Sequence, residues 1–394
     1  MEKLHDVRVL CFLIILVPIA FKFVKSETFF IVTTSETPCF ESSSNESSLR
    51  SGHPENIDGS FGDKELPCLT LQQFVERFTN NSYQNLTNIT LELDSGEHSL
   101  DSNLSVFNIP SFALKSGTAA TVICSHPGVT LLLHSIEDVL ISETTFVGCE
   151  KIVISFVDQF RFENSSFQSS PNGSLVLNYA MNATVTGSSF TKVSQRQCDR
   201  AAITVSNSSV LVQYCTFSEN EATIYSTRSA IEIDSCTFVN NSLMGCDQEF
   251  HITGIIKAIN GPRTNKKVTI TNSDFIDNRK VTDDYDSYVT GIFIDGSTLV
   301  QNNTFIDNKF HGSDQLLFIN TEYNEIIIDH NYVYNNDVTI YIDSSNTSIT
   351  ISNNNFTDNY GTAVVMYIKG ATVTVNDSYF YGNTNIPGYM KMEL

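Results

Sequence analysis

The sequence contains no tryptophan, and only 17% of its residues are charged. Asparagine, serine and threonine carry most of its polarity. Acidic residues outnumber basic ones, which gives a formal net charge of −21. Nucleic acid and anionic membranes repel such a chain, so neither is expected as a partner. Beyond residue 21 there is no apolar run of the roughly 20 residues that a membrane helix needs.

Several kinds of chemical motif are also missing. There is no Cys-x-x-Cys pair of the sort that binds zinc, and the histidines show no metal-ligand spacing. No phosphate-binding loop and no Ser-His-Asp arrangement can be recognised. The sequence therefore predicts no cofactor.

The N-terminus has the three parts of a secretory signal. Lys3 and Arg8 form a basic start, an apolar run covers 9–21, and the small residue Ser26 offers a cleavage point before Glu27. We interpret 1–26 as a signal peptide, which predicts a secreted protein or one on the extracellular face, with no membrane insertion after signal removal. The alternative is an uncleaved N-terminal anchor.

Cysteines and glycosylation motifs agree with export. Without the signal an even set of cysteines remains, as an oxidising compartment favours, although eight cysteines allow many pairings: Cys39, Cys68, Cys124, Cys149, Cys198, Cys215, Cys236 and Cys246. Predicted N-glycosylation sites, of the form Asn-x-Ser/Thr, are Asn45, Asn80, Asn85, Asn88, Asn103, Asn164, Asn172, Asn182, Asn207, Asn240, Asn302, Asn346, Asn355 and Asn376.

An internal repeat organises most of the chain. Segments of the form Phe-x-x-Asn, such as CTFSEN and NTFIDN, recur about every 21 to 30 residues with occasional longer gaps. The aromatic positions are Phe146, Phe167, Phe190, Phe217, Phe238, Phe275, Phe305, Tyr332, Phe356 and Phe380. A period of this size, with variable insertions, is typical of one coil of a solenoid plus its loop.

The interior of the repeat indicates which solenoid. Aliphatic residues seven and five positions before the aromatic, such as Val210 and Val212, alternate as in a half-buried strand. Three positions before it stand residues that tolerate a left-handed backbone: Asn164, Gly187, Asn272, Asn302, Asp329, Asn353 and Asp377. A third strand follows a variable loop, as in AAITV (201–205), SAIEI (229–233), TGIFI (290–294) and TAVVM (362–366).

Three short strands, one tight corner and one extensible loop per repeat predict an all-β fold, a right-handed parallel β-helix of about ten coils. In-register stacking would make a ladder of the aromatics and an amide ladder of the corner asparagines. No leucine-rich repeat frame recurs. A β-sandwich is the remaining alternative, but its strands would not repeat one pattern coil after coil.

An N-terminal cap is expected before the coils, because a β-helix needs its open ends covered. Residues 69–78 have helical apolar spacing, and Thr70 with Gln73 forms a capping box. Residues 88–99 predict the first strand and turn, and Cys39 with Cys68 could close a flexible loop over 40–65. The predicted domains are 1–26 (signal), 27–100 (cap and loop) and 101–394 (β-helix, with its C-terminal cap absent or the chain incomplete).

The repeats resemble those of chlamydial polymorphic outer-membrane proteins. They are more similar to the β-helical, pectin-lyase-like ectodomain families of simple animals, in which a cap reading Cys-x-Thr-Leu-x-Gln precedes the coils. Residues 67–73 (PCLTLQQ) fit that cap, and 145–149 (TFVGC) fit the first coil. The resemblance covers roughly 66–383 and implies an extracellular setting, but it implies no known chemistry. The Gly-Gly-Ala-Ile half of the bacterial repeat is degenerate here.

The alternative is a polysaccharide-active enzyme, because many right-handed β-helices are enzymes that act on polysaccharides. Polygalacturonase-type motifs have a partial parallel in Asn272-Ser273-Asp274, Asp283-Asp284, His311-Gly312 and Ile368-Lys369. These segments make Asp274, Asp283, Asp284, His311 and Lys369 the candidate catalytic residues. Phe310 and Tyr367 replace the expected glycine and arginine, however. The set is therefore incomplete.

A weak calcium site at Asp283, Asp284 and Asp286 is the one metal hypothesis, because clustered carboxylates suit Ca²⁺. The leading hypothesis is a non-catalytic extracellular scaffold or recognition protein that binds proteins or glycans. Its rival is a hydrolase or lyase with a diverged site. The long loops at 241–258, 279–289 and 309–315 are where either function is expected.

Overall fold

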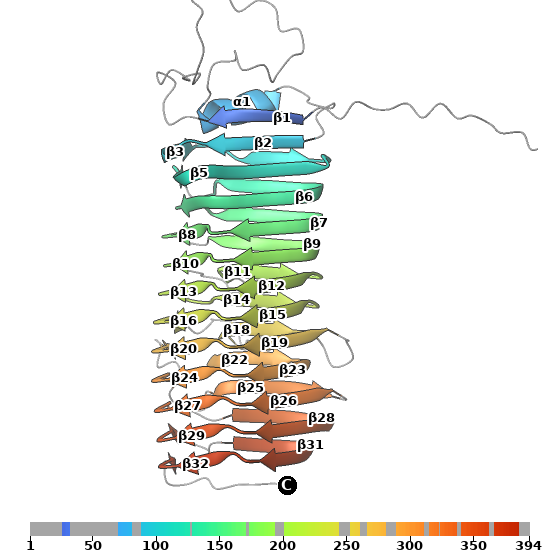
Figure 1. Ribbon diagram of the computed structural model, residues 1–394, viewed down its shortest axis with the longest axis vertical. Coiled ribbons are helices and arrows are strands. Elements are labelled where there is room, and N and C mark those ends of the chain that lie inside the picture. The colour runs from blue at the N-terminus through green and yellow to red at the C-terminus, as the bar shows by residue number, and fades with distance from the viewer. Residues whose placement is uncertain are drawn as a thin grey trace, which may run out of the picture.

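The computed structural model is a tall stack of parallel coils that runs along the whole described chain (Figure 1). The structure describes residues 26–31, 70–80, 88–126, 128–170, 173–193, 201–243, 253–260, 266–280, 289–310, 315–322, 324–336, 340–361 and 366–385. Each strand pairs in parallel with its counterpart in the next coil. The predicted right-handed parallel β-helix is confirmed.

Three faces, called sheets one, two and three, wind around one apolar core. Sheet one contains β4 (Leu104–Phe107), the first parts of β6 (Thr130–Val147), β7 (Lys151–Glu163) and β9 (Ser174–Thr186), then β11 (Ile203–Ser206), β14 (Ile224–Thr227), β18 (Thr253–Ile259), β22 (Val289–Asp295), β25 (Gln315–Glu322), and the first parts of β28 (Ile340–Ser352) and β31 (Met366–Asn376).

Sheet two contains β1 (Ser26–Ile31), β2 (Asn88–Leu93), the first part of β5 (Ser111–Cys124), later parts of β6, β7 and β9, then β12 (Ser209–Gln213), β15 (Ala230–Asp234), β19 (Lys267–Thr271), β23 (Ser297–Gln301), β26 (Glu325–Asp329), and the second parts of β28 and β31.

Sheet three contains β3 (Gly96–Leu100), the ends of β5 and β6, β8 (Ser166–Gln168), β10 (Ser189–Thr191), β13 (Thr216–Ser218), β16 (Thr237–Val239), β20 (Asp274–Ile276), β24 (Thr304–Ile306), β27 (Tyr332–Tyr334), β29 (Asn355–Thr357) and β32 (Tyr379–Tyr381). Two short pairs lie outside these sheets: β17 (Ser242–Leu243) with β21 (Arg279–Lys280), and β30 (Tyr360–Gly361) with β33 (Thr384–Asn385).

The predicted cap helix is present as α1 (Leu71–Asn80), at the N-terminal end of the stack (Figure 1). Its start is the predicted capping box: the Thr70 amide donates to Gln73 Oε1 at 3.1 Å, and the Gln73 amide donates to Thr70 Oγ1 at 3.2 Å. The sequence missed β1, which pairs with β2 along its whole length and precedes the strand expected at 88–99.

The aromatic ladder is confirmed over most of its length. Ring centroids of Phe190, Phe217, Phe238, Phe275 and Phe305 follow one another at 5.1, 4.8, 4.6 and 4.8 Å, with nearly parallel planes. Each of these side chains is at most 3% exposed. Because the coils are in register, the same residue type recurs at one point of the core and forms a continuous column.

One aromatic position was assigned wrongly. Val333, not Tyr332, pairs with Phe305, and it is 4% exposed whereas Tyr332 is 38% exposed. The tight corner of this coil is therefore His330, with a φ of 53°, and not Asp329. The segment NYVYNN caused the wrong assignment, because its first tyrosine stands one residue before the inward position. Strand alternation therefore points Tyr332 outward.

The amide ladder exists, but the sequence placed it at the wrong asparagine. The corner residues Asn272, Asn302 and Asn353 have φ near 53° and are exposed. The buried ladder is the last residue of Phe-x-x-Asn: Asn220, Asn241, Asn278, Asn308, Asn336, Asn359 and Asn383. In it each Oδ1 accepts from the backbone and side-chain amides of the preceding asparagine, as Asn278 Oδ1 does from Asn241 at 3.0 and 2.9 Å.

A second buried ladder lies two positions before the aromatic. It consists of Asn303, Asn331 and Asn354, and small residues replace asparagine in earlier coils. Cys215 and Cys236 are two of these, both buried and free. A hydrogen bond with Cys215, together with burial, raises the pKa of Cys236, so it stays a protonated thiol.

The coil also has more tight corners than the one predicted. The residue two positions after the aromatic is left-handed as well, as at Glu219, Asp277 and Asp307. SAIEI (229–233) was assigned to the wrong strand, because it forms β15 on sheet two, and the sheet-one strand of that coil is β14. Sequence patterns cannot separate these strands when both alternate with aliphatic residues.

The cysteines are paired only in part among the described residues. Cys124 and Cys149 form a disulfide between neighbouring coils. Cys149 occupies the ladder position that asparagine takes later in the chain. Cys39, Cys68, Cys198 and Cys246, the signal peptide and the 40–65 loop lie outside the described residues.

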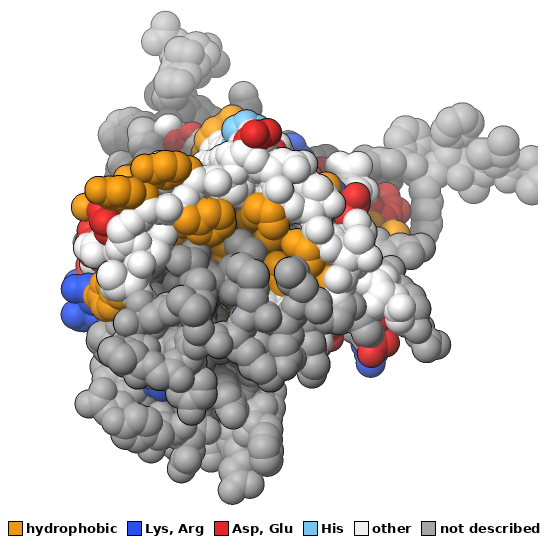
Figure 2. Space-filling model, turned by 90° about the horizontal axis from the view of Figure 1, so that it is seen from below, with side chains coloured by type: hydrophobic (Ala, Val, Ile, Leu, Met, Phe, Trp, Pro, Cys, Tyr) orange, Lys and Arg blue, Asp and Glu red, His pale blue; other side chains and the backbone are white. Residues whose placement is uncertain are grey.

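The last described coil has apolar groups at its surface. Seen from the C-terminal end, hydrophobic side chains lie among the described residues (Figure 2). Val375 is 52% exposed and Phe380 46%, whereas their counterparts one coil earlier, Ile351 and Phe356, are fully buried. In the described part of the chain, no helix is long and apolar enough to cross a bilayer.

Candidate binding face on sheet one

The outer surface of sheet one carries an unusual row of side chains in consecutive coils. Tyr225, Lys257, Phe293, Phe318 and Tyr341 pair in register from β14 to β28. Each stands between two inward residues, which are aliphatic except for Ser226, so strand alternation points it outward. The long loops from sheet three lead into this sheet, so the row lies where insertions are concentrated.

These side chains contact one another along the row. Lys257 Nζ lies 5.1 Å from the centre of the Tyr225 ring, a cation–π distance. The ring centroids of Phe293 and Phe318 are 5.2 Å apart, and those of Phe318 and Tyr341 are 5.0 Å apart, both edge to face. Phe293 and Lys257 are only 7% and 5% exposed, while the other three are half-buried.

The residues two positions before Lys257 and Phe318 on these strands are buried. Ile255 and Leu316 are at most 3% exposed and belong to the apolar core. Phe310 belongs to the same core and is 1% exposed, and a Cβ on Gly291 would lie 3.2 Å from its ring. Phe310, which breaks the polygalacturonase-like His motif, therefore has a structural role as part of the apolar core beside sheet one.

A polar column runs beside the aromatic row. Asp295, Asn320 and Asp343 occupy equivalent positions two residues after Phe293, Phe318 and Tyr341. Aromatic rings beside carboxylate and amide groups can bind a sugar chain, because the rings pack on its C–H faces and the polar groups accept its hydroxyl protons. Two coil steps put Asp295 and Asp343 about 10 Å apart, slightly beyond the roughly 6.5–9.5 Å of an inverting glycosidase.

Two carboxylates on the corner between sheets two and three have perturbed pKa values. Burial opposes ionisation of Asp234, but hydrogen bonds from Gln213 (2.9 Å), Asn272 (2.6 Å) and Thr271 (2.9 Å) outweigh it and lower its pKa. The pKa of Asp329 is lowered in the same way. A carboxyl group held ionised cannot serve as a general acid near neutral pH.

Of the predicted catalytic residues, only Asp274 and Lys369 lie in the described part of the chain, and the structure does not bring these two together. Asp274 begins β20 on sheet three, half-buried on its outer side. Lys369 belongs to β31 on sheet one, four coils further along, where it pairs with Asp343. Asp283, Asp284, Asp286 and His311 lie outside the described residues, so the hydrolase and calcium hypotheses stay predictions.

Sequence reasoning missed the row on sheet one, because it followed only the Phe-x-x-Asn frame. The available signal was an aromatic residue between two aliphatic ones in successive repeats, as in GIFI, LLFI and TIYI. That pattern predicts an aromatic side chain on the outer face of a buried strand. The register that aligns these segments came only from the structure.

The sequons whose side chains are described lie at the surface. Seven are exposed: Asn103, Asn164, Asn182, Asn240, Asn302, Asn346 and Asn376. Asn88, Asn207 and Asn355 are half-buried, and the side chains of Asn45, Asn80, Asn85 and Asn172 are not described. No asparagine of the two buried ladders starts a sequon, so glycans at these sites would leave both ladders intact.

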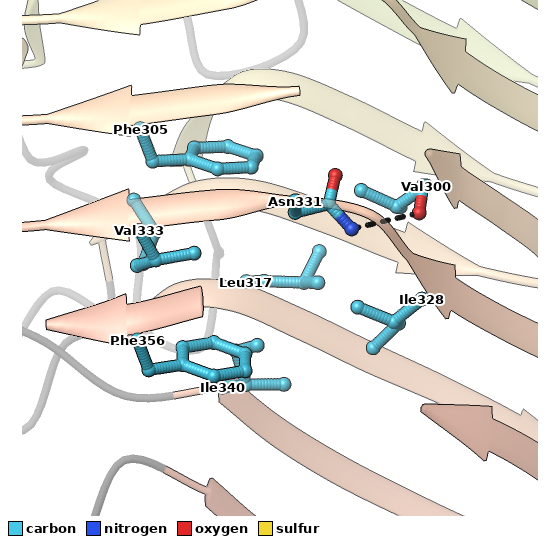
Figure 3. Close-up of a pocket in the computed structure, with 9 residues that line it drawn as sticks. Val300, Phe305, Leu317, Ile328, Asn331, Val333, Ile340 and Phe356 are labelled. Atoms are coloured by element: carbon cyan, nitrogen blue, oxygen red, sulfur yellow. Dashed lines mark hydrogen bonds between the residues drawn. The ribbon is translucent and has the colours of Figure 1, made fainter. Parts of the chain in front are cut away.

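A small cavity inside the stack is a packing defect and not a binding site. It lies where Val333 interrupts the aromatic ladder between Phe305 and Phe356 (Figure 3). Its lining is apolar except for Asn331, whose Nδ2 donates to the Val300 carbonyl at 3.0 Å. A cavity without several polar groups has no means of orienting a polar ligand.

Comparison with known proteins supports the fold. The family model for the right handed beta helix region matches residues 127–287 and 263–389. No curated protein sequence matches the chain.

Among solved structures, PfbA, a surface adhesin of Streptococcus pneumoniae, is similar at 12% identity, with a TM-score of 0.34 over 81% of this chain and 87% of PfbA. The periplasmic alginate epimerase AlgG is 10% identical, with a TM-score of 0.31 over 80% of this chain and 83% of AlgG. The pectate lyase Pel9A is 11% identical, with a TM-score of 0.31 over 92% of this chain and 80% of Pel9A. At these values no activity transfers to this chain.

Proposed function

The chain belongs to the family of right-handed β-helix proteins, and from this premise we propose that it is an extracellular, non-catalytic recognition protein that binds a carbohydrate chain along sheet one. The observation that carries the proposal is the aromatic row from Tyr225 to Tyr341 beside the polar column of Asp295, Asn320 and Asp343. A linear ligand suits a face whose contact groups repeat at every coil. The signal-like N-terminus and the surface position of the described sequons support export.

The composition of the row favours a sugar chain with hydroxyl groups or positive charge over an acidic polysaccharide. Asp295 and Asp343 would repel carboxylated sugars, and the net charge of −21 would add to that repulsion. Lys257 is 5% exposed and lies against Tyr225, so it offers little charge to an anionic ligand. Neutral polysaccharides and amino-sugar polymers are therefore the ligand classes to test first.

The test is calorimetric titration of the secreted protein with neutral, amino-sugar and acidic oligosaccharides. Phe318→Ala removes a ring at the centre of the row, and we expect an affinity loss of about 10-fold, from about 1.5 kcal/mol of ring contact. Asp343→Asn removes a charged acceptor and should weaken binding by at least 10-fold. Tyr332→Ala, an exposed tyrosine on sheet three, is the matched control and should bind normally.

Catalysis is examined on the same ligands by release of reducing ends and of unsaturated products, with and without Ca²⁺. Turnover that Asp274→Ala or Asp284→Ala abolishes would replace the recognition proposal with a diverged hydrolase or lyase. If no oligosaccharide binds, the proposal of a glycan ligand fails. Binding that Phe318→Ala and Asp343→Asn leave unchanged would place the site away from sheet one.

A further inference from the structure

A second exposed aromatic group lies on the N-terminal coils, at the corner between sheets one and two. Phe107, His134, Phe156 and Tyr179, called here the aromatic ridge, follow one another in four consecutive coils. Their centroids are 6.0, 5.2 and 4.8 Å apart. Phe107, Phe156 and Tyr179 are 47–53% exposed, so the ridge keeps a large apolar area at the surface.

The backbone of the ridge has an unfavourable conformation at two of its aromatic residues. Phe156 and Tyr179 have φ of 55° and 54°, a left-handed conformation that bulky residues rarely adopt. At the equivalent left-handed position, other coils have small or polar residues: Asn108, Ser135, Asn207 and Arg228. The rings of Phe156 and Tyr179 stack on each other and leave one Tyr179 face for a further contact.

The next step of the same column is a glycosylation motif. Asn178 pairs in register with Ser206. Asn207 is therefore the residue of the following coil that is equivalent to Tyr179. Asn207-Ser208-Ser209 is a sequon, and Ser209 is exposed. Asn207 is half-buried, and its Nδ2 donates to Ser206 Oγ at 2.9 Å. Phe156 stacks on one face of the Tyr179 ring at an interplanar angle of 6°, so the other face is turned toward Asn207.

We propose that an N-linked glycan on Asn207 packs its first sugar against the Tyr179 ring, so that this glycan covers the end of the aromatic ridge. In the modification, the Asn207 amide nitrogen attacks the anomeric carbon of a lipid-linked oligosaccharide. The N–C bond forms, the bond to the lipid pyrophosphate breaks, and the amide proton leaves. The inference rests on export, which belongs to the proposed function above.

A free polysaccharide is a poorer occupant of this ridge. The faces of Phe156 and Tyr179 cover each other, and the other contacts along the ridge are edge to face, so a sugar chain lying lengthwise would meet ring edges. A sugar fixed to Asn207 is delivered to the one open stacking face. The attachment also removes most of the association entropy that a free ligand would lose.

The experiment uses the full chain secreted from a eukaryotic host. Glycopeptide mass spectrometry measures occupancy at Asn207, with Asn164 and Asn302 as exposed internal controls. Ser209→Ala abolishes the sequon without changing Asn207. Tyr179→Ala removes the ring. Tyr214→Ala is the matched control, because Tyr214 is also exposed (61%) and also has a φ of 54°, but lies on another corner.

We expect Asn207 to be occupied, and Ser209→Ala to lower Tm by about 2 °C, as loss of a contact of about 1 kcal/mol would. In a Tyr179→Ala background Ser209→Ala should leave Tm unchanged, whereas in a Tyr214→Ala background the full shift should persist. Tyr179→Ala, but not Tyr214→Ala, should also speed endoglycosidase release of the Asn207 glycan from the native protein several-fold.

The outcomes separate this inference from the proposed function. Occupied Asn164 and Asn302 with an empty Asn207 would overturn the glycan contact and leave export standing. No occupied sequon at all would overturn both. An occupied Asn207 whose release rate and Tm shift are the same in the Tyr179→Ala and Tyr214→Ala backgrounds would overturn the contact, and the ridge would then be a surface for a protein partner.

Discussion

The position of the amide ladder can be tested with two asparagines from one coil. Asn278 is fully buried, and its side chain makes four hydrogen bonds at 2.9–3.0 Å: two from Asn241, one to the Phe238 carbonyl and one to Asn308 Oδ1. Asn272 is exposed at the tight corner, with contacts to Asp234 and Asn302. The chain itself thus provides a buried variant site and an exposed control.

Asn278→Ala leaves the Asn241 backbone amide buried without an acceptor, at a cost of about 1–3 kcal/mol, and removes the other three bonds, worth about 0.5–1.5 kcal/mol each. Some rearrangement is expected, so we predict a loss of about 3–5 kcal/mol in the free energy of unfolding. Asn272→Ala should lose about 1–2 kcal/mol, because water replaces its contacts and the main cost is the left-handed backbone, which alanine tolerates less well than asparagine.

The measurement is urea unfolding followed by circular dichroism, with native-state proteolysis as a second readout, since a long repeat can unfold in parts. The slope of the transition is compared among variants to check that the same region unfolds. Equal losses for Asn272→Ala and Asn278→Ala would refute the reasoning, because the ladder would then carry no more stability than an exposed corner.

Three further predictions address other parts of the molecule. Val333→Leu adds one methylene to the cavity and should raise the urea midpoint by the equivalent of about 0.8 kcal/mol; a lower midpoint would mean that the cavity cannot accept the group. Hydrogen bonds from Ser352 and His330 overcome the effect of burial and lower the pKa of Asp329 in the folded state. The ionised Asp329 should therefore stabilise the fold fully above pH about 4, and this contribution should be lost as the pH falls toward the depressed pKa. Asp329→Asn should make the free energy of unfolding depend less on pH below about 4; an unchanged pH dependence would contradict this. Replacing Cys124 and Cys149 together by serine should cost about 3 kcal/mol, because the disulfide closes a loop of sequence separation 25, and a variant as stable as the parent under non-reducing conditions would argue against the bond.

The candidate site could be predicted from the sequence only in part. The aromatic residues of sheet one stand in GIFI, LLFI and TIYI, but variable loops separate these segments, so their alignment depends on strand pairing. The same holds for the ridge, where Phe156 and Tyr179 lie inside long strands without a turn signature. The Asp274 group looked plausible in linear order, yet Asp274 and Lys369 lie on different sheets.

The sequence by itself determined the coil: the recurring Phe-x-x-Asn and the alternation before it define one turn of a parallel β-helix, because period and burial are local properties of the chain. The cap helix was equally local, since Thr70 and Gln73 bond each other within one turn. Only the tertiary structure decided which asparagine is buried, since neighbouring coils supply its partners from 21 to 40 residues away. Stacking likewise decided that Val333 and not Tyr332 faces the core, and it brought Tyr179 next to Asn207. These are contacts between coils, and the length of the intervening loops hides them from any pattern within one repeat.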